Sequence, residues 1–339
     1  MSFVSRLRNA GKKATAALAV VATVASVMVA GTGVASANPR EALRADATGT
    51  CEWDAVQYWV QRCDVFSPSM GRNIPVQIQP AARGGNAALY LLDGMRATDT
   101  ENAWTHFSNA PAKFVDNNIT LVMPVGGAGS FYIDWNSPAT FLPGGVVYRW
   151  ETFLANELPT YLEQNFGVAR NNNSVAGLSM GGTAALNLAA KHTDQFRQAL
   201  SYSGVLTMNS PGMYPLLAIA LLQVGGFNIN SMYGGYISPA RFENDPFWNM
   251  DGLRGKDVYV SAASGIPDLP DLSAPQYFAD GAALELLSRE STLVWEAKAR
   301  LTGINVTSDY PILGIHSWAQ FDSQLSKTHD RILNVMNAW

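Results

Sequence analysis

The segment Gly177-Leu178-Ser179-Met180-Gly181 is the most informative part of this 339-residue sequence. An apolar run, Ser174–Ala176, comes directly before it, and a helix-compatible run, Gly182–Ala190, comes directly after it. A serine between two glycines on a strand-to-helix turn is typical of a nucleophile elbow. Such a turn is so sharp that only small residues fit beside the serine, which explains the two glycines. We therefore expect the Ser179 hydroxyl to stand above a sheet, at the N-terminus of the following helix.

Apolar runs and longer helix-compatible stretches alternate along the rest of the chain. Strands are predicted at Ala87–Leu92, Ile119–Pro124, Ser174–Leu178, Gln198–Tyr202, Val258–Ala262 and Val306–Tyr310. Helices are predicted at Tyr148–Asn165, Gly181–Lys191, Ala279–Leu301 and Ser317–Asn337. Two earlier apolar runs, Val56–Phe66 and Ile74–Gln79, are expected to pair antiparallel at one edge. The pattern predicts an α/β protein with a mostly parallel central sheet flanked by helices, and with the elbow it predicts the α/β-hydrolase fold.

The N-terminal 37 residues have the pattern of a secretory signal peptide. Basic residues without any acid precede an apolar run from about Ala14 to Ala30, and Ala35-Ser36-Ala37 supplies the small residues of a cleavage site. We expect cleavage after Ala37 and export of the mature chain to the cell wall, the outer envelope or the extracellular medium. Residues 38–339 are then predicted to form a single catalytic domain, because no linker, repeat or charge block divides them.

The segment at about 207–251 is irregular and rich in Gly, Pro, Met and Tyr. Long ordered loops in compact domains are often functional, so this segment is interpreted as an insertion that covers the active site. Its apolar patch, Leu216–Val224, is either part of that cover or an ordinary core helix. The candidates for contact with lipid are Leu216, Leu217, Ile219, Leu221 and Leu222.

Charge and cysteine content restrict the possible partners. Loss of the signal peptide removes four basic residues and no acid, which changes the formal net charge from −4 to −8 and argues against nucleic acid as a partner. Cys51 and Cys63 are expected to form a disulfide, because an exported chain meets oxidising conditions. No His, Cys or acidic cluster with ligand spacing accompanies them, so we predict no metal site and no cofactor.

One of four histidines is suited to be the catalytic base. A serine hydroxyl becomes a strong nucleophile only when an imidazole takes its proton, so a histidine is needed after the last strand. His106 precedes Ser179, contrary to the order Ser, acid, His in this fold. His192 lies in the helix after the elbow, and His329 lies inside the last predicted helix. His316 lies between the last predicted strand and the last helix, and we choose it as the base.

The residues alone leave the catalytic acid open. Asp268 and Asp271 follow the predicted strand at Val258–Ala262, a common place for the acid of this fold, and on that ground Asp268 comes first. Glu285 and Glu290 lie later, on a predicted helix.

Acyl transfer also needs two hydrogen-bond donors that face the developing oxyanion. The backbone N–H of Met180, directly after the nucleophile, is one candidate, and that of Met95, in the loop after an early strand, is the other. Asp93 and Arg96, beside Met95, are suited to binding a polyol.

Eight segments resemble the mycolyltransferase family, the antigen 85-like enzymes of mycolate-bearing actinobacteria, and the corynebacterial type among them. The segments are Leu91-Leu92-Asp93-Gly94-Met95-Arg96-Ala97, Val122-Met123-Pro124-Val125-Gly126-Gly127, Ser130-Phe131-Tyr132, Asp134-Trp135, Trp150-Glu151-Thr152-Phe153-Leu154, Glu157-Leu158-Pro159, Val175-Ala176-Gly177-Leu178-Ser179-Met180 and His316-Ser317-Trp318. The resemblance extends from about Asn73 to Phe321, which is nearly the whole mature chain.

The resemblance implies an α/β-hydrolase whose serine carries a mycoloyl or corynomycoloyl group. The donor would be trehalose monomycolate, the acceptor a second trehalose ester or wall arabinogalactan, with peripheral contact to envelope lipid. The family's nucleophile and base fall on Ser179 and His316, and its acid falls on Glu285, which therefore moves ahead of Asp268. The oxyanion donors fall on the backbone of Met95 and Met180, and the sugar-binding residues fall on Asp93, Arg96, Asn109, Ser317 and Trp318.

Two alternatives remain beside acyl transfer to a sugar. A secreted carboxylesterase of the esterase D or feruloyl esterase type would use the same catalytic residues and pass the acyl group to water. A non-catalytic envelope protein would keep the fold and bind glycolipid, but loss of a catalytic residue would then be expected. The segments Asp93-Gly94-Met95-Arg96 and His316-Ser317-Trp318 favour transfer.

Overall fold

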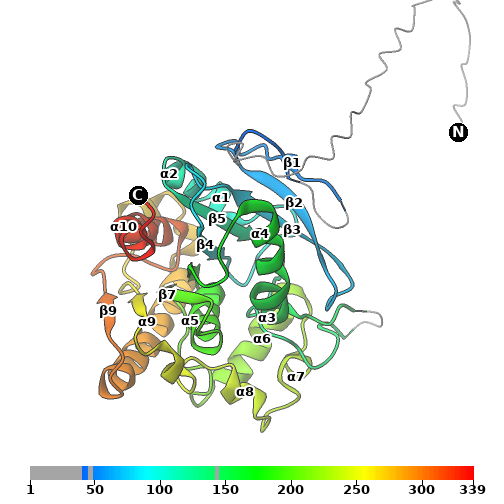
Figure 1. The fold of residues 1–339 in the computed structure, drawn as a ribbon. Helices are drawn as coiled ribbons and strands as arrows, with labels where there is room; N and C mark the ends of the chain where they lie inside the picture. Colours follow the sequence, from blue (N-terminus) through cyan, green and yellow to red (C-terminus); the bar gives the residue numbers. More distant parts are fainter. Residues whose placement is uncertain (1–39, 45–48, 142–144) are drawn as a thin grey trace, which may run out of the picture. The chain divides into compact units, whose positions relative to one another are not determined.

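A computed structural model describes residues 40–44, 49–141 and 145–339, so the predicted signal peptide lies outside the described residues. A nine-stranded sheet runs through this part of the chain in the order β1-β2-β3-β5-β4-β6-β7-β8-β9 (Figure 1). The strands are β1 (Glu52–Trp53), β2 (Gln61–Ser67), β3 (Arg72–Gln79), β4 (Ala87–Leu92), β5 (Ile119–Pro124), β6 (Asn173–Leu178), β7 (Phe196–Tyr202), β8 (Asp257–Ser261) and β9 (Val306–Asp309).

Strand direction divides the sheet into two parts. The pairs β1–β2, β2–β3 and β3–β5 are antiparallel. The pairs β5–β4, β4–β6, β6–β7, β7–β8 and β8–β9 are parallel, so the carboxyl ends of these strands meet at one edge. The predicted α/β-hydrolase fold, with a mostly parallel sheet and an antiparallel edge, is confirmed.

Helices cover both faces of the sheet because each central strand is apolar on both sides. In β4, Tyr90 and Leu92 belong to one buried cluster, and Leu89 and Leu91 belong to another. The first cluster is completed by helices α4, α5 and α9, and the second by α1, α2 and α10. These helices are α1 (Ala103–His106), α2 (Ala110–Phe114), α4 (Leu158–Phe166), α5 (Met180–Lys191), α9 (Phe278–Leu301) and α10 (Trp318–Met336).

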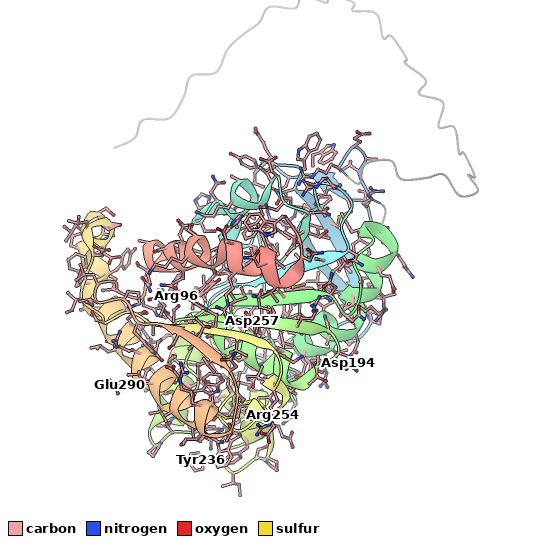
Figure 2. All side chains as sticks on the ribbon, turned by 60° about the vertical axis from the view of Figure 1, so that its left-hand side comes forward. Arg96, Asp194, Tyr236, Arg254, Asp257 and Glu290 are labelled. Carbon is pink, nitrogen blue, oxygen red and sulfur yellow. A yellow bond between two sulfur atoms is a disulfide. The ribbon has the colours of Figure 1, made fainter. Side chains whose placement is uncertain are left out.

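Ion pairs attach α10 to its surroundings. Lys113 of α2 lies 2.9 Å from Asp322 of α10, and the two helices are neighbours in Figure 1. Arg331 of α10 donates two hydrogen bonds to the carboxylate of Asp257, at the start of β8. Asp257 is labelled in Figure 2. The helix that directly follows His316 is therefore fixed at several points along its length.

The segment 207–251 contains helices α6 (Met213–Gly225), α7 (Ile229–Tyr233) and α8 (Ala240–Glu243), followed by the 3-10 turn η2 (Met250–Leu253). Arg241 of α8 stacks between the rings of Tyr214 and Tyr236, 4.5 and 4.7 Å from their centroids. Such cation–π contacts tie the start of α6 to α8. The apolar patch of this segment is thus a helix, and its Leu217 and Leu221 belong to the buried core.

The predicted disulfide is confirmed, since Cys51 and Cys63 are bonded to each other. It joins the residue before β1 to the middle of β2 and closes a loop in which Gln57, Tyr58 and Trp59 have left-handed backbone conformations, with φ of 67°, 50° and 64°. A disulfide across such a loop limits the freedom of the unfolded chain.

Several boundaries differ from the prediction. The predicted helix at Tyr148–Asn165 begins at Trp150 and contains a π-helical turn, η1 (Phe153–Glu157), between α3 (Trp150–Thr152) and α4. The short helices α1 and α2 were not predicted, because four or five residues are too few to show helical periodicity. In the described part of the chain, none of the helices combines the length and the apolar character that a membrane span requires.

Candidate active site

The turn between β6 and α5 has the strained geometry of a nucleophile elbow. Ser179 has φ 53° and ψ −121°, outside the regions that non-glycine residues usually occupy. A β-carbon at Gly177 would lie 2.3 Å from the backbone of Gly181, and one at Gly181 would lie 2.5 Å from the carbonyl oxygen of Leu92. Neither position accepts a side chain, which is the reason the sequence prediction gave for these glycines.

His316 and Glu285 are in contact. Oε2 of Glu285, a fully buried residue of α9, lies 2.9 Å from Nδ1 of His316. The backbone N–H of His316 donates to the carbonyl of Gly281 at 3.0 Å, so His316 is attached to α9 through both its backbone and its ring. A carboxylate at Nδ1 favours the tautomer in which Nε2 is free to accept a proton.

Ser179 and His316 line one small apolar cavity of about 130 Å³. Its remaining wall comes largely from α6 and α9, through Met213, Leu216, Leu217, Ala220, Leu284 and Leu287. Within the described residues no hydrogen bond joins the serine to the histidine, and such contacts commonly tighten only when substrate is bound.

The two candidate oxyanion donors, Met95 and Met180, both line the cavity that contains Ser179. Met180 is the first residue of α5, and the side chain of Met95 lines the same cavity as Ser179. Neither backbone N–H donates a hydrogen bond to an acceptor in the described part of the chain. The Met95 carbonyl accepts from Gly129 at 3.0 Å, and the Met180 sulfur accepts from the N–H of Phe131 at 3.2 Å. Both residues are therefore held while their N–H groups remain available.

Asp93 points into the protein and supports the loop that carries Met95. Its carboxylate accepts from the N–H of Gly94 at 2.7 Å and of Ala103 at 2.9 Å, and the residue is only 4% exposed. Burial raises the pKa of Asp93, and these two backbone donors oppose that rise. The sequence suggested contact with a polyol, whereas in this structure both oxygens are used to shape the loop.

Asp268 and Asp271 do not contact the imidazole of His316 in the described structure. They form a reciprocal cap at the start of the 3-10 turn η3 (Leu269–Ser273). Asp271 also accepts from the hydroxyl of Ser317 at 2.7 Å, which attaches this turn to the residue after the base. The order reached from the fold alone, with Asp268 first, does not agree with these contacts.

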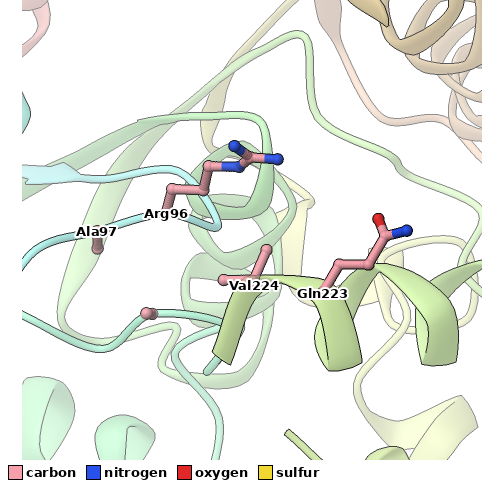
Figure 3. A pocket seen from close by; sticks show the side chains of 5 residues that line it. Arg96, Ala97, Gln223 and Val224 are labelled. Carbon is pink, nitrogen blue, oxygen red and sulfur yellow. The ribbon is translucent and has the colours of Figure 1, made fainter. Parts of the chain in front are cut away.

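Arg96 lines a second cavity of about 250 Å³. Ala97, Ala128, Gln223 and Val224 complete its lining, and Figure 3 shows the side chains of Arg96 and Gln223 extending toward the same side. Gln223 was not predicted, because its position near the end of α6 shows no signal in the sequence.

Two other predicted sugar-binding residues, Trp318 and Asn109, line neither cavity. Trp318 begins α10 and packs on Trp104 and Phe107, with ring centroids 5.4 and 5.1 Å apart. Asn109 is an exposed residue that caps α2 in a left-handed conformation, and it lines neither of the two cavities.

Sequence reasoning also missed Ser203, whose hydroxyl donates to Oε1 of Glu285 at 2.8 Å. A signal was present, since Ser203 directly follows β7 as Ser179 directly follows β6. Among the described residues there is no group of three or more His, Cys, Asp or Glu side chains arranged to hold a metal ion.

Comparison of this chain with known proteins identifies several relatives. The family model described as a putative esterase matches residues 67–332. Diacylglycerol acyltransferase/mycolyltransferase Ag85C of Mycobacterium avium is 36% identical over 332 residues, covering 96% of this chain and 90% of its own length. Diacylglycerol acyltransferase/mycolyltransferase Ag85B of Mycolicibacterium smegmatis is 40% identical over 267 residues, covering 77% of this chain and 80% of its own.

A solved structure agrees with the sequence comparisons. The crystal structure of Mycobacterium tuberculosis MPT51 (FbpC1) matches with a TM-score of 0.72 at 29% identity, covering 82% of this chain and 98% of that one. The likeness in sequence and in three dimensions therefore extends over most of the described chain.

Proposed function

This chain belongs to the putative esterase family and, within it, to the antigen 85-like mycolyltransferases, and on that premise we propose how it works. It is an acyltransferase, and in our proposal it takes a mycoloyl group from trehalose monomycolate onto Ser179. The group then passes to a hydroxyl of a second trehalose monomycolate or of wall arabinogalactan. Glu285 and His316 complete the catalytic triad.

The observation that carries the proposal is a pair of unlike cavities, one lined by Met95 and the other by the next residue, Arg96. One is apolar and contains Ser179 and His316, and the other presents Arg96 and Gln223. Helix α6 contributes to both, with Leu216 and Leu217 facing the apolar cavity. An acyl chain suits the first cavity and a sugar suits the second, as expected for an enzyme that moves a lipid between sugars.

In the acylation step, His316 Nε2 takes the proton of the Ser179 hydroxyl as the oxygen attacks the ester carbonyl. The tetrahedral oxyanion accepts hydrogen bonds from the N–H groups of Met95 and Met180. When the intermediate collapses, the bond to trehalose breaks and His316 returns the proton to the leaving sugar oxygen. The products are free trehalose and a mycoloyl ester of Ser179.

In the transfer step, the acceptor takes the place of trehalose. His316 removes the proton of an acceptor hydroxyl, which attacks the ester carbonyl of the acyl-enzyme. Collapse of the second oxyanion releases the Ser179 oxygen, which regains its proton from His316. Arg96 and Gln223 are placed to hold the acceptor sugar, and a sugar hydroxyl held there competes with water for the acyl group.

The apolar cavity is too small to enclose a whole corynomycoloyl group. Its volume of about 130 Å³ is below the range of about 300–1,000 Å³ typical of pockets that enclose a whole ligand. Part of the acyl chain must then lie outside the cavity. Export through the N-terminal signal would bring the enzyme to the envelope, where such lipids and the wall polysaccharide are located.

The proposal is tested with the mature protein, residues 38–339, incubated with a corynomycoloyl trehalose monoester. We expect a trehalose diester among the lipid products and an acyl adduct on Ser179, both detected by mass spectrometry. The variant Ser179→Ala should lose at least about 10⁴-fold in rate, as triad knockouts of this kind do.

Three outcomes separate the possible functions. A diester that depends on Ser179 supports transfer between sugars. Free fatty acid as the sole product, with added trehalose present, would instead identify a hydrolase of the esterase type. No turnover of this ester or of any short ester would leave a glycolipid-binding protein.

A further inference from the structure

Glu285 is held by two donors on the oxygen that does not face the base. Oε1 accepts from the hydroxyl of Ser203 at 2.8 Å and from the backbone N–H of Ala263 at 2.6 Å, whereas Oε2 faces His316. We propose that Ser203 is a positioning residue that orients the catalytic acid. The inference rests on the proposed triad, and it assigns to Ser203 no contact with substrate.

The terminal torsion of a glutamate explains why such a residue is needed. Rotation of the carboxylate about its last bond has a broad, nearly two-fold profile, so the side chain alone does not fix which way its oxygens point. Two donors on Oε1 define that rotation and direct Oε2 toward Nδ1 of His316. Because Glu285 has no exposed surface, water cannot supply a replacement donor without entering the core.

The backbone at Ser203 is strained in a way that serves this contact. Ser203 is fully buried and has φ 52°, a conformation that costs a non-glycine residue about 1–3 kcal/mol unless its surroundings impose it. Its N–H donates to the carbonyl of Ser261 at 2.7 Å, which anchors the turn after β7 to the end of β8. This turn directs the Ser203 hydroxyl toward α9. A residue with extended backbone at this position would instead continue the direction of β7.

Hydrogen bonds link the carboxyl ends of β6, β7 and β8 to Ser179 and to Glu285. The N–H of Ser179, after β6, donates to the carbonyl of Tyr202 in β7 at 2.9 Å. Ser203 follows β7 and Ala263 follows β8, and both bind Oε1 of Glu285. Nucleophile and acid are thus positioned by the same edge of the sheet, so a shift of the β7 end would move both.

The test compares three single substitutions in the mature protein. Ser203→Ala removes the donor, and Ser203→Gly removes it while also relieving the backbone at φ 52°. Ser201→Ala is the matched control, because Ser201 is a buried residue of β7, two positions before Ser203, and its hydroxyl has no hydrogen-bond partner in the described part of the chain. Hydrolysis of p-nitrophenyl butyrate reports on the triad without requiring the sugar acceptor.

We expect kcat to fall about tenfold to a hundredfold in both Ser203 variants, with KM unchanged. This corresponds to loss of one hydrogen bond to a charged group. The Ser201→Ala variant should keep the wild-type kcat. Equal losses in Ser203→Ala and Ser203→Gly would show that the hydroxyl, and not the strained backbone, is responsible.

A spectroscopic measurement separates positioning from general damage. The proton between His316 Nδ1 and Glu285 gives a far-downfield proton NMR signal in protein labelled with ¹⁵N-histidine, assigned by its absence in His316→Ala. We expect this signal to shift or broaden in Ser203→Ala and to stay in place in Ser201→Ala. Melting temperatures of all variants are measured alongside.

The outcomes distinguish this inference from the proposed function. An unchanged kcat and NMR signal in Ser203→Ala would overturn the positioning role, as would a lower kcat that follows a lower melting temperature while the signal stays unchanged. If the wild-type protein is inactive on every ester but the NMR signal still responds to Ser203→Ala alone, the proposed function fails and the positioning of Glu285 stands.

Discussion

The carboxyl group of Glu285 allows a sharp test at the level of single residues. Glu285→Gln keeps the size of the side chain but replaces a carboxylate oxygen at His316 with an amide, so Nδ1 no longer has an ionised partner. We expect kcat/KM for short esters to fall by about 10³–10⁴-fold, comparable to the loss of the acid in other triads.

Asp268→Asn is the comparison for that experiment. Asp268 accepts from the N–H of Leu269 at the start of a 3-10 turn, and its side chain is remote from the imidazole in the described contacts. Its variant should keep activity within about a factor of three, because loss of such a cap affects local stability by about 1 kcal/mol. Retained activity in Glu285→Gln together with loss in Asp268→Asn would reverse the assignment of the acid.

These carboxyl groups also show what a sequence reveals about individual residues. Ser179 and His316 are marked by their local context, since one lies in a glycine-bounded turn and the other lies between the last strand and the last helix. Glu285 has no such context, and it was selected only through resemblance to a family. Its environment depends on where α9 passes the ends of β7 and β8, which is a tertiary property.

At the level of elements, α6 offers a matched pair of substitutions. Leu216 and Ile219 are 47% and 56% exposed on the same helix, but only Leu216 lines the apolar cavity. Leu216→Asp should lower kcat/KM for esters of long acids at least tenfold while sparing p-nitrophenyl acetate, because a carboxylate at the cavity disfavours the acyl chain. Ile219→Asp should leave both activities unchanged in the same assays.

The five residues that the sequence predicted to contact lipid lie in different environments. Leu216 and Leu217 line the cavity, whereas Ile219 and Leu222 are more than half exposed and line neither cavity. Leu221 is fully buried, so its assignment to lipid contact was wrong. The sequence could not show which of these leucines and isoleucines are buried. A helix that is apolar all round has no polar face to mark the side that faces solvent.

The strands and the long helices were predictable, whereas the helices of the segment 207–251 were not. Continuous apolar runs such as the one in β4 are typical of strands buried on both faces, and their positions were correct to within two residues. The antiparallel strand predicted at Val56–Phe66 instead begins at Gln61, because the disulfide loop occupies the preceding residues. The π-helical turn before α4 has no pattern in the sequence that would reveal it.

The stability of the whole molecule should depend on the disulfide near its N-terminal edge. Cys51 and Cys63 are separated by 12 residues, and both are buried. Replacing both with serine should lower the free energy of unfolding by about 2–4 kcal/mol, chiefly because the unfolded chain regains the freedom of this loop. Urea unfolding of the double variant and of the oxidised wild type measures the difference.

The esterase activity of the same double variant should be measured as well as its stability. The disulfide joins β1 and β2, which lie at the opposite end of the strand order from β8 and β9. Under conditions where the double variant remains folded, kcat for short esters should match the wild type. A large loss of kcat in folded protein would show that the N-terminal edge controls the site.

The order of the strands has a further consequence for association between molecules. The outermost strands, β1 and β9, contain two and four residues, and all longer strands lie between them. An exposed edge is a template on which another chain can add a strand, and very short edge strands are one way in which proteins prevent this. At both edges of its sheet, the described part of the chain thus presents little backbone on which another chain could add a strand.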